Sequence, residues 1–193
     1  MMEVLKKNPK ENIDVLIKAG LSDDTELTHY ATTTMMEIQG DYEARIKSCE
    51  DILKVNPQDY DCLRSYRKIL SDYIGSNLLS GNVLTIYRNK LFKCLEELIW
   101  NYPSVRHYKL QYIETCLDIN KIEEAGKRIT EFRNNWPENE DGLKMALNYF
   151  RKINRGDLVN QLLKEIADNN YYLSPEGRQW FAFWENSDTF GRE

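Results

Sequence analysis

The sequence predicts an all-α protein, folded as a right-handed α-α superhelix of about ten helices. Apolar residues recur at spacings of three and four along most of the chain, and no segment shows the alternation of a strand. Pro57, Pro103, Pro137 and Pro175 separate successive amphipathic runs. Proline fits the first turn of a helix but not its interior, so each one predicts the end of one helix and the start of the next. The prolines recur at intervals that are typical of a repeated helix pair.

The N-terminal elements are predicted from glycines and from an acidic helix start. Gly20 and Gly40 divide this region into helices at 10–19, 24–39 and 41–55, and Asp23-Asp24-Thr25-Glu26-Leu27 opens the second of them. The third carries an apolar stripe formed by Ile46, Cys49, Ile52, Leu53 and Val55.

The remaining elements follow in the same way. After Pro57, a stripe from Leu63 to Tyr73 predicts a helix at 59–74, and the segment between Gly75 and Gly81 reads as a turn. A longer helix is expected at 79–101. Breaks at Pro103, Asn120, Pro137 and Gly156 then predict helices at 104–118, 121–135, 139–153 and 156–169, and Pro175 opens a last one at 175–185.

Composition excludes several classes of protein. The 193 residues are 41% hydrophobic and 30% charged, which is typical of a folded soluble chain, and no apolar run reaches the ~20 residues that cross a bilayer. The net charge of −5 argues against nucleic-acid binding, which needs clustered Lys and Arg. No secretory signal follows Met1. We expect a cytoplasmic chain, or the cytosolic part of a membrane-anchored protein, that inserts no segment of its own into a membrane.

The four cysteines point to a reduced protein rather than to a metal site. Cys49, Cys62, Cys94 and Cys116 lie well apart in the sequence, without the close pairs of zinc or redox motifs. They are predicted to be core thiols.

The repeats resemble those of the tetratricopeptide family. The stretch from Gly40-Asp41-Tyr42-Glu43 to Asn56-Pro57 is similar to the second half of such a repeat, and Asn120 to Pro137 forms a second copy with the small residue Ala125. Gly156-Asp157-Leu158 begins a third, weaker copy. Arg45 departs from the family pattern, since a small residue is expected there. The resemblance covers about residues 40 to 170, and we expect repeats over 40–174.

The first 39 residues are more similar to a HEAT-type helix pair. A HEAT-like pair that leads into tetratricopeptide repeats resembles the cytosolic portion of the scaffold subunit in Pel-type bacterial exopolysaccharide export. This resemblance implies a role in assembling an exopolysaccharide synthesis or export complex.

No motif predicts catalysis. His29 and His107 lack a carboxylate or cysteine at ligand spacing, and the acidic clusters at Glu123-Glu124 and Glu138 to Asp141 stand at helix starts, where they complement the dipole. We therefore expect no enzyme activity, no cofactor and no metal.

The first helix of each pair supplies candidate partner-binding residues. Lys144, Asn148 and Arg151 share one face of the helix after Pro137, because they are spaced by four and three positions. The tetratricopeptide resemblance implies that Lys144 and Asn148 contact an acidic peptide or a C-terminal carboxylate. The equivalent faces offer Arg64, Lys68 and His107, together with Glu114. A solvated polar surface is the alternative reading.

The residues from 175 to 193 are expected to form a capping helix and a tail. Trp180, Phe181, Phe183 and Trp184 make this helix so apolar that it must either cover the last repeat or dock on a partner.

The predicted function is a non-enzymatic scaffold that binds a protein or peptide through the concave face of the solenoid. The alternative is a small-ligand sensor or regulatory domain with a pocket between the N-terminal helix pair and the repeats.

Overall fold

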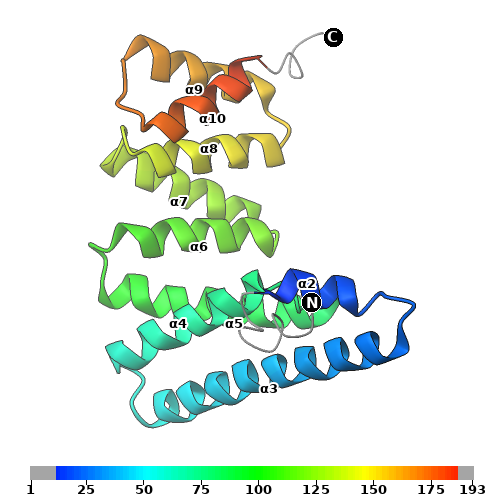
Figure 1. The fold of residues 1–193 in the computed structure, drawn as a ribbon. Helices are drawn as coiled ribbons and strands as arrows, with labels where there is room; N and C mark the ends of the chain where they lie inside the picture. The colour runs from blue at the N-terminus through cyan, green and yellow to red at the C-terminus, as the bar shows by residue number, and fades with distance from the viewer. Residues whose placement is uncertain (1–11, 187–193) are drawn as a thin grey trace. The chain divides into compact units, whose positions relative to one another are not determined.

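The computed structural model describes residues 12–186, and within this range the chain forms nine α-helices and no strand. They are α2 (Ile13–Ala19), α3 (Thr25–Val55), α4 (Tyr60–Gly75), α5 (Gly81–Asn101), α6 (Arg106–Asp118), α7 (Ile122–Asn135), α8 (Glu140–Lys152), α9 (Gly156–Asp168) and α10 (Pro175–Asn186) (Figure 1). The all-α prediction is confirmed. The start of the predicted helix 10–19 and the tail 187–193 lie outside the described residues. The chain divides into two compact units between Tyr102 and Pro103.

In unit 1, consecutive helices pack against one another: α2 on α3, α3 on α4, and α4 on α5. Apolar stripes meet between them, with Leu16, Leu70 and Leu95 fully buried. Polar contacts also join α3 directly to α5, because Tyr87 and Lys90 donate hydrogen bonds to Glu43 and Glu50.

The predicted helix break at Gly40 is wrong. Helix α3 runs for 31 residues through this glycine, so the expected helices 24–39 and 41–55 are one element. A helical glycine costs ~1 kcal/mol relative to alanine, but Ile38, Tyr42 and Ile46 are buried on one face on both sides of it. This continuous buried stripe outweighs the local preference. The Gly-Asp-Tyr-Glu sequence therefore lies inside a helix and does not open one.

Unit 2 contains an internal repeat. Helices α6 and α8 have the same length and begin at Arg106 and Glu140, and α7 and α9 begin at Ile122 and Gly156. Each helix of the second pair, α8 and α9, therefore begins the same number of residues after its counterpart in the first pair, α6 and α7. We call this number of residues the repeat offset. Each helix packs on the next from α6 to α9, and α6 also contacts α8. The unit is thus made of helix pairs whose first helices touch.

Asparagine residues in the left-handed conformation follow helices α6 and α8. Asn120 and Asn154 adopt the left-handed conformation with φ of 61° and 55°, and the following amides of Lys121 and Arg155 donate back to the carbonyls of Cys116 and Phe150. This is the Schellman arrangement, which satisfies the last carbonyl groups of a helix. Asparagine tolerates positive φ better than most residues, which explains the predicted break at Asn120.

Helix α10 continues the sequence register of the first helices α6 and α8. Ile113, Leu147 and Phe181 follow one another at the repeat offset on α6, α8 and α10, and they are 1%, 1% and 3% exposed. The same register therefore buries one apolar side chain in each copy.

The four cysteines are buried thiols outside any disulfide, as predicted. Within the described residues, no helix is both long enough and apolar enough to span a membrane.

Candidate functional site: the α9–α10 pocket

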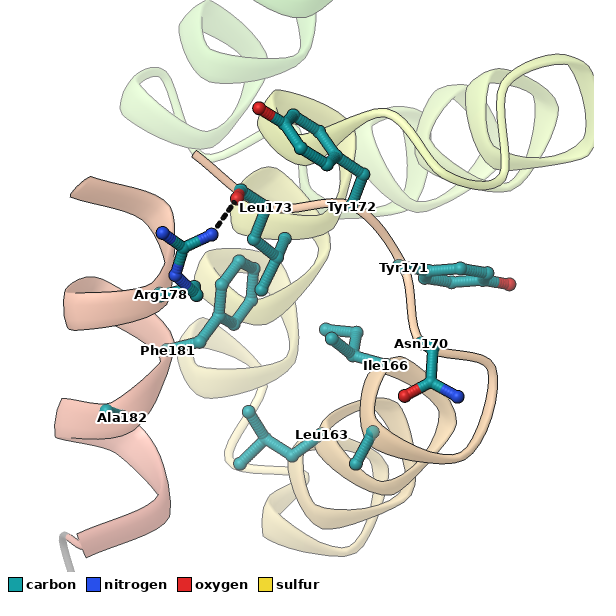
Figure 2. A pocket seen from close by; sticks show the side chains of 10 residues that line it. Leu163, Ile166, Asn170, Tyr171, Tyr172, Leu173, Arg178, Phe181 and Ala182 are labelled. Atoms are coloured by element: carbon teal, nitrogen blue, oxygen red, sulfur yellow. Dashed lines mark hydrogen bonds between the residues drawn. The ribbon is translucent and has the colours of Figure 1, made fainter. Parts of the chain in front are cut away.

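A pocket of about 490 Å³ opens between α9, α10 and the segment that joins them. Its lining consists of Leu163, Ile166, Ala167, Asn170, Tyr171, Tyr172, Leu173, Arg178, Phe181 and Ala182. In Figure 2, side chains from α9 and α10 face each other across this space. We call it the α9–α10 pocket.

The pocket walls are apolar and well supported. Leu163 and Ile166 come from the buried stripe of α9, and Phe181 is a deeply buried aromatic residue of α10. At the outer edge, Tyr172 is 83% exposed. The site therefore joins a fixed apolar interior to an exposed aromatic rim.

Arg178 supplies the positive charge of the pocket. Its Nη1 atom donates a hydrogen bond of 2.7 Å to the carbonyl of Leu173, which holds the guanidinium at the rim (Figure 2). Among the described residues, no carboxylate forms an ion pair with it. The remaining guanidinium N–H groups are thus oriented but have no anionic partner there.

The corresponding segment of the first copy carries a tryptophan. Counting back by the repeat offset from Ile166 and Asn170 gives Phe132 and Trp136, whose rings pack at 4.8 Å, with the Lys109 ammonium 5.2 Å from the indole. Trp136 has a φ of −141°, whereas Asn170 is left-handed at φ 50°. The second copy therefore ends in a different turn and lacks the indole.

The predicted binding residue Lys144 is held in a structural contact. Its ammonium lies 2.5 Å from Glu140, and the same carboxylate accepts hydrogen bonds from the backbone and hydroxyl of Ser174. Burial raises the pKa of Glu140, but the bonds from Lys144 and Ser174 outweigh it and hold this pKa below its ordinary value. Lys144 thus helps to anchor the start of α10 on α8.

Arg151 is brought to α10 as well. Its guanidinium lies 5.6 Å from the ring of Trp184, so two groups of predicted residues meet at this point. Asn148, on the same helix, is half-buried. On α10, Trp180 and Trp184 pack at 5.6 Å, while Phe183 is 67% exposed.

The other predicted residues lie elsewhere. Arg64 and Lys68 are exposed on α4 of unit 1, where Arg64 lies 3.7 Å from Asp61 and 5.8 Å from the ring of Tyr60. His107 is exposed on α6 of unit 2, and its ring contacts that of Tyr108. These side chains therefore lie on different helices.

Sequence reasoning missed Arg178 and the α9 wall. Arg178 follows Lys144 by one repeat offset, so extending the repeat into the last helix would have found it. No comparable signal marks the pocket itself, because its opening depends on how the chain turns after α9.

The described residues contain no group of three metal-ligating side chains that could hold an ion. The fold defines an all-α, helical-repeat-like protein, compatible with a solenoid. No family model, curated protein or solved structure matches the chain.

Proposed function

We propose that this chain is a protein-interaction module of tetratricopeptide-like helix pairs, without catalytic activity, which binds a peptide segment of a partner protein. The observation that supports the proposal most directly is the α9–α10 pocket at the end of the unit 2 repeats. It combines an apolar interior with an oriented cation that pairs with no carboxylate of the described residues. Sites that recognise peptides need both features, since apolar burial supplies affinity and charge fixes orientation.

The repeat architecture supports the same proposal. A stack of helix pairs exposes long surfaces with little loss of stability, because each pair needs only its neighbours. The first helices α4, α6 and α8 carry the basic residues predicted to contact a partner. Of these, Arg64 and Lys68 remain exposed, whereas Lys144 and Arg151 contact Glu140 and Trp184.

The proposal is tested with a displayed library of random peptides selected against the full chain. We expect enriched peptides that, once synthesised, bind in solution with saturable heats in calorimetry. Three variants locate the surface that binds these peptides, since binding should weaken where the altered residue contacts them. They are the double change Arg64→Glu with Lys68→Glu, the change Arg151→Glu, and the change Arg178→Glu. Failure to enrich any peptide over an unrelated helical protein would contradict the proposal.

A narrower proposal assigns the partner to a bacterial exopolysaccharide synthesis or export complex. It depends on the resemblance of the sequence alone. Its test is direct binding between this chain and purified proteins of such a complex, with the same variants as controls.

A further inference from the structure

We infer that the α9–α10 pocket binds an aromatic side chain of a partner peptide, with a nearby carboxylate of that peptide paired to Arg178. The inference rests on the proposed function and names the chemistry of the ligand. It follows from a comparison of the two second helices of unit 2, which match at the repeat offset but differ in their side chains and in the turns that follow them.

The first copy shows what this part of the fold accommodates. There the indole of Trp136 packs on Phe132, and Lys109 lies 5.2 Å from its ring, as described above. An indole, the ring of Phe132 and a cation thus lie together at the end of α7. This arrangement is favourable because the ring face carries partial negative charge.

The second copy retains the apolar floor without the ring, and its cation comes from the following helix, whereas the cation of the first copy comes from the preceding helix. Leu163 and Ile166 are 8% and 7% exposed, Phe181 closes the α10 side, and Asn170 stands where the earlier copy has Trp136. A ring that enters from outside would contact three apolar side chains. Because burial of apolar surface is favourable, such a ring can dominate the affinity of the peptide that carries it.

The positive charge of Arg178 favours an acidic residue beside that ring in the bound peptide. Lys144 and Arg178 are equivalent by the repeat offset, but Lys144 has Glu140 four positions earlier, and Arg178 has Ser174. The Arg178 guanidinium is already fixed by its bond to Leu173. A carboxylate can accept from its other N–H groups in a bidentate geometry that lysine does not provide.

The experiment uses the full chain and the displayed peptide library, with two matched variants on α10. Ala182→Phe places a ring inside the pocket, whereas Gln179→Phe adds the same ring at an exposed position that does not line it. Circular dichroism and thermal melting confirm that both variants remain folded. We expect Ala182→Phe to lose a group of selected peptides that Gln179→Phe retains, and these peptides should share an aromatic residue close to Asp or Glu.

Synthetic peptides from that group then test each contact by fluorescence anisotropy. Replacing the aromatic residue with alanine should weaken binding at least about tenfold. Replacing the acid with lysine should weaken binding to the wild type but strengthen binding to Arg178→Glu.

The outcomes separate this inference from the proposed function. Selected peptides that bind both ring variants equally, or that lack an aromatic and acidic pair, would overturn the inference and leave the interaction module intact. A library that yields no binding peptide would overturn both.

Discussion

Glu50 of α3 links three helices of unit 1 through one carboxylate oxygen. Lys90 of α5 donates to its Oε1 atom at 2.7 Å, and Tyr66 of α4 donates to the same atom at 2.8 Å. Burial raises the pKa of this carboxyl, but the hydrogen bonds from Lys90 and Tyr66 and the charges of Lys90 and Lys54 together lower it by more. The net result is a pKa below the ordinary value.

This lowered pKa predicts an acid-dependent loss of stability. A carboxyl whose folded pKa lies below its unfolded value stabilises the fold above about pH 4.3, and the stabilisation disappears as pH falls through the folded pKa. We expect Glu50→Gln to lower the urea midpoint at pH 7, with the difference from wild type narrowing below about pH 4. An unchanging difference from pH 7 to pH 3 would contradict this account. Glu37→Gln, at an exposed position of the same helix, is the control.

The aromatic residues of α10 give a second prediction at this scale. Phe181 is 3% exposed and Phe183 is 67% exposed, although they lie two positions apart. Phe181→Ala should destabilise the protein by about 3 kcal/mol because it leaves a cavity, whereas Phe183→Ala should change stability by less than about 0.5 kcal/mol. Denaturant unfolding of both variants measures the difference. Equal effects would mean that Phe181 does not anchor α10.

At the scale of the element, α3 shows how packing overrides a local signal. Glycine has no preference for the helix, yet Gly40 sits inside a helix of 31 residues. Its missing Cβ is not required by any neighbour, since nothing among the described residues lies within 4 Å of the position it would take.

Gly40→Ala is therefore expected to stabilise the protein by about 0.5–1 kcal/mol. The gain comes from the lower backbone entropy of the unfolded chain, and the measurement is the midpoint of thermal or urea unfolding. Gly142→Ala serves as the contrast, because its Cβ would lie 2.6 Å from the Cε1 atom of the buried Phe132 ring, and it should destabilise. A destabilised Gly40→Ala would indicate that α3 bends or opens at this point.

Most helix boundaries could be predicted from glycine, proline and asparagine residues that interrupt helices. The breaks near Gly75, Asn120, Pro137 and Gly156 fall where the residues predict them, because each is a property of the local backbone. The break at Gly40 could not be judged locally, since it depends on whether Ile38 and Tyr42 find partners on other helices.

At the scale of the whole molecule, charge predicts colloidal behaviour. The chain carries a net charge of −5 and has a sequence pI near 5.3. Because repulsion between molecules vanishes near the pI, we expect a solubility minimum close to pH 5.3 and higher solubility at pH 7.5. Light scattering across this range measures it. A flat profile would show that uneven surface charge, rather than net charge, controls association.

The sequence by itself determined the all-α class, most helix ends and the buried state of the cysteines. These follow from apolar periodicity, proline and asparagine chemistry and side-chain polarity, all of which act over short stretches of chain. Only the tertiary structure decided that α3 is continuous, that Lys144 is held by Glu140, and that a pocket lies beside Arg178. Those features depend on which distant surfaces meet, and the free energy of packing between helices exceeds the local preferences that a sequence reveals.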